Sequence, residues 1–202
     1  MAIPLSVKVR ERALTNWRIR QVRRAGIHVG LAARVIGKPI VEVAAGSSVF
    51  LGDRTVLVSL SEWTALGVSR PVIIRTLRPG ASITIGSDVG LSGTTICCAS
   101  SITLGDRILI GADVMIVDTD FHEVDVIPRR YLPTPEPKPE HAISIGDDVF
   151  IGARSIILKG SRIGAGAVIA AGSVVSGDIP PGTVAGGVPA RPLRMVSDTA
   201  NG

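Results

Sequence analysis

The chain has few of the residues on which many folds and chemistries depend. Aromatic side chains make up only 3% of its 202 residues, and there are two cysteines and three histidines, although hydrophobic residues reach 46%. Aromatic side chains dominate the packing of most protein cores. Their scarcity therefore indicates a narrow core built from Ile, Val and Ala, and argues against a Gly-rich β-sandwich.

Other absences narrow the class of protein. No apolar run approaches the roughly 18 residues that a membrane-spanning helix needs, and the N-terminal segment lacks the apolar stretch of a signal peptide. Cys97 and Cys98 are adjacent, so a disulfide between them would not cross-link distant segments of the chain. The sequence thus predicts a reduced, cytoplasmic protein. Nucleic acid is not an expected partner, because no binding module or aromatic interleaving accompanies the basic residues.

Charge is concentrated at the N-terminus. The net charge is +5, but residues 1–38 hold nine lysines and arginines against Glu11 alone, a balance of +8, so the other residues carry −3. Residues 5–25 have helix-forming composition, which predicts a basic helical cap within 1–25. This cap can cover the open end of the fold with a solvated basic face, or it can contact an anionic membrane surface or lipid-linked substrate. The two interpretations are compatible, so the predicted location is cytoplasmic with possible peripheral membrane contact.

The clearest pattern in the chain is a six-residue period between Ile145 and Pro181. An aliphatic residue stands at every sixth position: Ile145, Ile151, Ile157, Ile163, Ile169 and Val175. A helix with 3.6 residues per turn would scatter these side chains, whereas short strands joined by corners would align them. Three strands and three corners make one coil of about eighteen residues. Hexapeptide periodicity therefore predicts an all-β parallel β-helix over residues 26–196.

Three interruptions break this period. Residues 59–71 read as a loop, in which Trp63 packs over a coil edge or lines a substrate pocket. One residue too many lies between Ile85 and Leu104, which predicts a bulge around the two cysteines. Residues 118–142 contain five prolines and form a long loop, of the kind that is usually functional or disordered. Residues 197–202 are predicted to be a disordered tail.

The start of the proline-rich loop carries the best candidate for chemistry. His122 falls one period after Leu104, Ile110 and Ile116, and Asp118 and Asp120 precede it. A neutral imidazole held by a carboxylate is a competent general base near neutral pH. Three alternatives remain: a loop histidine that caps a turn, a cysteine nucleophile paired with histidine, and a metal held by histidines between subunits.

Three quoted segments place the chain beside a known family. These are VGLSGTTICCASSITLGDRILIGADVMIVDTDFH, IGDDVFIGARSIILKGSRIGAGAVIAAGSVV and GGVPAR. Together they cover about residues 83–195, and they resemble the hexapeptide-repeat acyltransferases, in particular the branch that acetylates sugars of surface polysaccharides. The resemblance implies a left-handed β-helix, a hand that parallel crossovers normally avoid. It also implies a homotrimer with active sites between subunits.

The same resemblance implies roles for individual residues. His122 would take the proton from a saccharide hydroxyl as that oxygen attacks the thioester of acetyl-CoA, without an acyl-enzyme, and Asp118 or Asp120 would orient the imidazole. A backbone N–H would stabilise the oxyanion. Ser92 and Gly93 lie near where relatives contact the acceptor with an asparagine, which this chain lacks.

Coenzyme A would lie along a groove between C-terminal coils, and no metal is expected. The matching positions are Gly152, Ala153, Ala171, Ser176 and Arg191. Relatives often carry a basic residue where this chain has Gly177, so phosphate binding would rely on Arg191, Arg154 or Lys159. The alternatives to an acetyltransferase are a non-catalytic β-helix scaffold and a carbonic-anhydrase-like metalloenzyme of the same fold.

Overall fold

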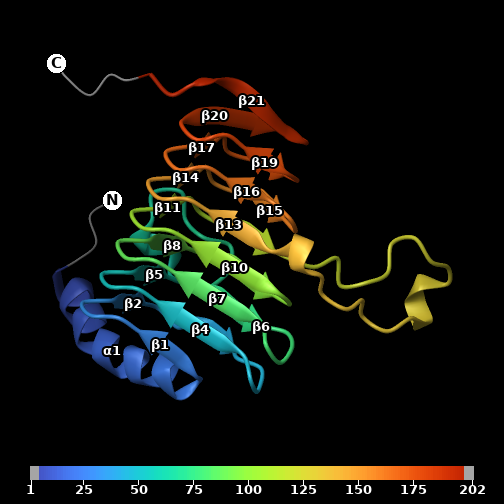
Figure 1. Ribbon diagram of the computed structural model, residues 1–202. Coiled ribbons are helices and arrows are strands. Elements are labelled where there is room, and N and C mark those ends of the chain that lie inside the picture. The colour runs from blue at the N-terminus through green and yellow to red at the C-terminus, as the bar shows by residue number, and fades with distance from the viewer. Residues whose placement is uncertain (1–4, 198–202) are drawn as a thin grey trace.

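The computed structural model describes residues 5–197 as one α-helix, three short 3-10 helices and a stack of short strands in three mainly parallel sheets (Figure 1). Sheet A contains β1 (Ile27–Val29), β4 (Ser48–Leu51), β7 (Ser82–Ile85), β10 (Ser101–Leu104), β13 (Ile143–Ile145), β16 (Arg162–Ile163) and β19 (Asp178–Ile179). Sheet B contains β2 (Arg34–Ile36), β5 (Val56–Val58), β8 (Gly90–Ser92), β11 (Leu109–Ile110), β14 (Phe150–Ile151), β17 (Val168–Ile169), β20 (Thr183–Gly187) and β21 (Ala190–Met195). Sheet C contains β3 (Ile40–Glu42), β6 (Ile73–Thr76), β9 (Thr95–Cys98), β12 (Met115–Val117), β15 (Ile156–Leu158) and β18 (Val174–Val175).

The chain visits sheets A, B and C in turn, so each circuit adds one strand to every sheet. Each strand pairs in parallel with the equivalent strand of the next coil, apart from β20 and β21, which form an antiparallel hairpin at the C-terminal end. The result is a left-handed parallel β-helix with three flat sides. The predicted fold class is confirmed.

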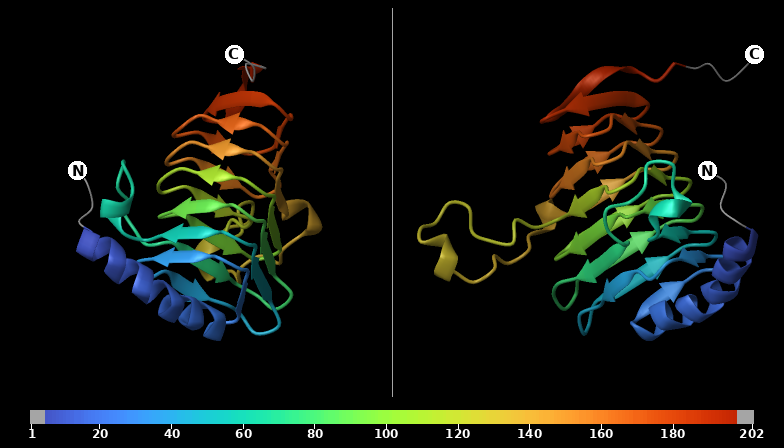
Figure 2. Two further views of the ribbon diagram at one scale, coloured as in Figure 1. Left: turned by 90° about the vertical axis from the view of Figure 1, so that its left-hand side faces the viewer. Right: turned by 180° about the vertical axis from the view of Figure 1, so that it is seen from behind.

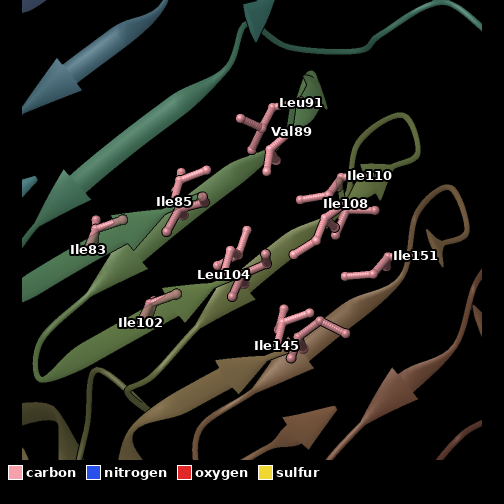
Figure 3. Close-up of a cluster of buried hydrophobic side chains, with 14 of the residues drawn as sticks. Ile83, Ile85, Val89, Leu91, Ile102, Leu104, Ile108, Ile110, Ile145 and Ile151 are labelled. Carbon is pink, nitrogen blue, oxygen red and sulfur yellow. The ribbon is translucent and has the colours of Figure 1, made fainter. Parts of the chain in front are cut away.

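Aliphatic ladders fill the interior of this prism. Figure 3 shows Ile83, Ile85, Ile102, Leu104 and Ile145 on sheet A beside a matching set on or just before the strands of sheet B, which comprises Val89, Leu91, Ile108, Ile110 and Ile151. These side chains are almost fully buried. Burying one such side chain stabilises the fold by roughly 1.5–3 kcal/mol. In a regular coil, a step of six residues takes the chain from one sheet to the next. The aliphatic residue then points into the interior from the equivalent position of that sheet, which explains the six-residue period.

The edge between sheets A and B has the same length in every coil. The spacing across it is always six residues, from Val29 to Val35 at one end and from Ile179 to Ala185 at the other. Glycine follows the sheet A aliphatic in all but the last coil, as at Gly146 after Ile145. A Cβ on Gly146 would lie 2.6 Å from the Ala165 amide nitrogen of the next coil. Close stacking of backbones therefore dictates glycine here.

Acidic side chains reinforce the same edge by capping the neighbouring coil. Asp106 accepts the Ser87 N–H at 2.7 Å, and Asp147 accepts the Asp106 N–H at 2.9 Å. One residue further along, Arg107 donates from Nε to Asp148 at 2.7 Å. These contacts tie each coil to the next along the outside of the edge.

Variation in length is confined to the other two edges. Between Ile85 and Leu104, the step from Leu91 to Ile96 is five residues and the step from Ile96 to Leu104 is eight. The single extra residue predicted near the cysteines is thus the net result of two extra residues after Ile96 and one missing before it. The longer corner accommodates them without a register shift in sheet A.

Two long loops leave the prism from different edges (Figure 2). Residues 59–71 lie between sheets B and C and include the short helix η1 (Ser61–Trp63). Residues 118–142 lie between sheets C and A and include η2 (Arg129–Tyr131) and η3 (Pro139–His141). The second loop projects far from the coils, as the sequence predicted.

Helix α1 (Leu5–Arg24) lies across the N-terminal end of the prism. Val22 is buried against the first coil, and Arg23 donates to the Val29 carbonyl at 2.8 Å. Arg20 and Arg24 stay exposed, and their contact with an anionic membrane surface remains a prediction. Within the described chain, no helix has the length and apolar character needed to cross a bilayer. Of the predicted disordered tail, residues 198–202 lie outside the described residues.

Candidate active site

His122 lies just outside the coils, at the edge between sheets C and A. The chain leaves the prism after β12, so His122 does not continue the interior ladder and is exposed in the loop. Its side chain lines a cavity of about 640 Å³ together with Asp120, Glu123, His141 and Lys159. Two loop ends and the corner after β15 therefore meet around the predicted base.

Asp120 and Lys159 form an ion pair in this cavity. Lys159 follows β15 directly, so a rigid coil places its ammonium group opposite the loop. Both side chains are about one-third exposed. The sequence predicts Lys159 as one of three candidates for phosphate binding, whereas in the structure Lys159 is paired with Asp120.

Asp118 occupies a different environment from Asp120. It is fully buried, and its carboxylate accepts the Ala99 N–H at 2.6 Å and the Ser100 N–H at 2.8 Å. The Cys98 thiol donates to it at 3.3 Å. Asp118 thus holds the enlarged corner that follows β9. Of the two acids left open by the sequence, only Asp120 shares the cavity with His122.

The two cysteines are packed inside the wall of the prism. Burial raises the pKa of both thiols, and the nearby Asp118 carboxylate raises the pKa of Cys98 further. A thiolate is the nucleophilic form of cysteine, so this environment disfavours the cysteine-nucleophile alternative. No cluster of three or more His, Cys, Asp or Glu residues suited to a metal occurs within residues 5–197.

A second hollow runs along the edge between sheets B and C. It has a volume of about 410 Å³, and its floor consists of the corners at Ala112, Ala153 and Ala171. Leu66 and Gly67 of the loop 59–71 form its rim. The predicted acceptor residues Ser92 and Gly93 lie on the same edge, one coil before Ala112.

The predicted coenzyme residues therefore fall on two edges of one chain. Gly152, Ala153 and Ala171 lie at the B–C edge, whereas Ser176 and Arg191 share a small hollow of about 40 Å³ at the C–A edge. His122 belongs to the C–A edge. Sheet C separates the two groups, so a single chain does not bring the base and the alanine corners together.

The comparisons with known proteins agree with this architecture. The model of the family described as bacterial transferase hexapeptide (six repeats) matches residues 142–177. Through these residues the chain resembles the hexapeptide-repeat transferases. The matched residues include all six aliphatic positions of the sequence period, from Ile145 on β13 to Val175 on β18.

Named relatives of this hexapeptide-repeat chain are acetyltransferases. The galactoside O-acetyltransferase of Escherichia coli K12 is 36% identical over 123 residues, which cover 59% of this chain and 57% of the relative. A 2,3,4,5-tetrahydropyridine-2,6-dicarboxylate N-acetyltransferase of Staphylococcus aureus is 46% identical over 63 residues, or 31% of this chain and 26% of the relative. The matches thus span about half or less of these curated relatives.

A solved structure matches almost the whole chain. It is a hexapeptide-repeat-containing acetyltransferase of Vibrio cholerae in complex with acetyl coenzyme A, with 28% identity and a TM-score of 0.59. The match covers 96% of this chain and 87% of the other. The likeness to that protein therefore extends well beyond residues 142–177.

Sequence reasoning did not identify three features of the two hollows in this hexapeptide-repeat chain. His141 enters the cavity of His122 from the far end of the proline-rich loop. Leu66 and Asp113 line the second hollow. His141 and Leu66 lie in loops without the six-residue period, and Asp113 occupies a corner, so the period gave no signal for any of them.

Proposed function

We propose that this protein is an acetyl-CoA-dependent O-acetyltransferase that transfers the acetyl group to a hydroxyl of a saccharide, with His122 as general base. The observation that carries the proposal is the placement of His122 beside Asp120 and Lys159 in one cavity at the break between β12 and β13. The 36% identity to a galactoside O-acetyltransferase supports a sugar hydroxyl as acceptor. The acetyl-CoA complex of the Vibrio protein supports the donor.

In this mechanism His122 removes the proton from the acceptor hydroxyl while the oxygen attacks the thioester carbon. The tetrahedral intermediate collapses as the carbon–sulfur bond breaks, and the imidazolium returns the proton to the thiolate of CoA. His122 makes no hydrogen bond to any described residue, so its ring nitrogens are accessible to substrate. Asp120 is the carboxylate that would orient and stabilise the imidazolium.

The outward faces of the three sheets differ in polarity, which suggests how neighbouring subunits complete the site. Outward positions on sheet B form an apolar column that includes Val56, Leu109, Phe150 and Val168, and Leu109 is 63% exposed. Outward positions on sheet C include Ile73, Met115, Ile156 and Val174. Sheet A instead presents polar residues such as Thr84, Thr103, Ser144 and Arg162.

Contiguous exposed apolar surface marks association sites. We therefore propose a homotrimer in which the apolar faces B and C meet neighbouring subunits. The C–A edge of one subunit, with His122, would then face the B–C edge of the next, with Ala153 and Ala171. Each active site would combine the base from one chain with the coenzyme groove of another.

The test is CoA release from acetyl-CoA with a panel of sugars, for wild type, His122→Ala and His28→Ala. Removing a general base is expected to lower kcat by at least ~10²-fold and to leave the affinity for CoA unchanged. His28 is a matched control, because it stacks on Phe50 with ring centroids 4.8 Å apart on the outside of sheet A.

Three results would count against the proposal. Full activity of His122→Ala would exclude it as the base. Absence of CoA binding by the wild type would favour a non-catalytic scaffold. A stoichiometric metal in the purified protein that activity requires would favour the metalloenzyme alternative.

A further inference from the structure

The loop 59–71 replaces an ordinary corner of the prism with a much longer segment. Leu57 and Ile74 are successive interior positions separated by seventeen residues, where other coils use five or six at this edge. The extra residues fold back along the B–C edge toward the C-terminal coils. There Leu66 and Gly67 lie beside Ala112, Ala153 and Ala171, across the hollow described above.

The loop is held in place by specific contacts. The Ser69 N–H donates to both carboxylate oxygens of Asp113, at 2.9 and 3.2 Å. The Ser61 hydroxyl donates to the Val68 carbonyl at 2.6 Å and accepts the Val68 N–H at 3.0 Å, which closes the loop on itself. Val68 approaches Gly93 so closely that a Cβ there would lie 2.8 Å from the Val68 Cβ. The loop therefore has a defined position over the coils.

Asp113 is the anchor on the coil side. It is 8% exposed and adopts a left-handed backbone conformation with φ of 60°. Buried carboxylates are retained where their oxygens meet donors, and the donor here is the loop amide. Asp113 thus acts as a positioning residue for the loop.

The groove under this loop has an unusual wall. Leu66 is 74% exposed although its loop is fixed, and opposite it lie Ala112, Ala153, Ala171 and Gly172, with Asp113 and Arg154 as the charged members of the lining. A hollow with small alanine and glycine corners, one branched apolar wall and a basic side chain fits a slender chain that alternates amides with methylene groups and ends in phosphates. The pantetheine arm of an acyl-CoA has this chemistry.

We propose that the loop 59–71 is a wall of the coenzyme groove and that Leu66 contacts the pantetheine arm of the CoA thioester. This inference rests on the proposed function. Leu66 would be a binding determinant that the hexapeptide period does not encode, held in place by the contact between Asp113 and Ser69.

The test is isothermal titration of the full-length protein with CoA, for wild type, Leu66→Ala and Leu31→Ala. Leu31 is a matched control, because it is 75% exposed and lies in a turn at the opposite end of the prism. Loss of the apolar contact that Leu66 would make with bound CoA is expected to weaken CoA binding roughly 3- to 10-fold in Leu66→Ala, with no change in Leu31→Ala. Asp113→Asn should weaken binding in the same direction and speed amide hydrogen exchange of residues 61–69.

Each other outcome is decisive. Equal CoA affinities for Leu66→Ala and Leu31→Ala would overturn the inference while the proposed function stands. A change in molar mass of Leu66→Ala by light scattering, without a change in affinity, would assign Leu66 to a contact with a second copy. A wild type that fails to bind CoA would remove the proposed function and this inference together.

Discussion

The Asp118 carboxylate receives the Ala99 N–H at 2.6 Å inside the wall of the prism. Together with the bond from Ser100, this contact satisfies two backbone donors of a corner that is two residues longer than the regular six-residue step. Asp118→Ala leaves both donors without their partner. Because each unsatisfied buried donor costs about 1–3 kcal/mol, we expect the free energy of unfolding in urea to fall by about 2–4 kcal/mol.

Asp120→Ala provides the contrast. Asp120 is partly exposed and paired with Lys159, and such pairs contribute about 0–1 kcal/mol to stability. We expect a small change in stability and a clear loss of kcat if Asp120 orients His122. A variant of Asp118 that is as stable as wild type would show that the buried carboxylate is not a structural anchor.

Gly146 tests the close stacking of coils at the A–B edge. A Cβ at this position would meet the Ala165 amide nitrogen at 2.6 Å and its Cα at 2.8 Å. Forced overpacking costs typically 1–3 kcal/mol, so Gly146→Ala should lower the free energy of unfolding by about that amount. Gly90→Ala is the control, because nothing lies within 4 Å of a Cβ there. Equal stability of the two variants would contradict the stacking argument.

Low pH should weaken the ion pair between Arg107 and Asp148 on the outside of the same A–B edge. The hydrogen-bonding guanidinium of Arg107 lowers the pKa of Asp148. A carboxylate with a lowered folded-state pKa stabilises the fold above its unfolded pKa of about 3.9, and this contribution is lost as the pH falls through the lower folded value. The urea midpoints of wild type and Asp148→Asn should differ at pH 7 and converge in acid. Asparagine tolerates the φ of 57° at this position, so a difference that persists at low pH would point to backbone strain instead.

The apolar column on sheet B predicts the assembly state. Phe150 is 45% exposed beside Leu109 in the single chain. Burying an aspartate without a partner in an interface is strongly unfavourable, so Phe150→Asp should convert a trimer to monomers in light scattering. Thr103→Asp on the polar sheet A should leave the mass unchanged. A monomeric wild type would contradict the trimer proposal.

The fold could be predicted from the sequence because the residues that recur every six positions are the ones buried in the interior. Ile151 and Ile157 are six apart, and both have no exposed surface. Corners gave less information, since a net count of residues hides compensating changes such as those on either side of Ile96.

The candidate site was predictable only in part. His122 and Asp120 are two residues apart in sequence, whereas Lys159 and His141 reach the same cavity by tertiary placement. The burial of Asp118, two residues from Asp120, depends on the path of a corner nineteen residues away.

The constant spacing between sheets A and B has a consequence for how such a chain can change length. In every coil the spacing between the interior residues of sheets A and B is six residues, whatever the length of the corners at the other two edges. Loops can therefore be lengthened, exchanged or lost at two edges without moving any rung of the interior ladder. Because the strands of each coil pair only with those of the adjacent coils, excision of residues 146–163 would join Ile145 to Gly164 and preserve the Ile-Gly step. The molecule can therefore gain or lose whole coils, because the constant six-residue spacing at the A–B edge keeps the strands of every coil in the same register.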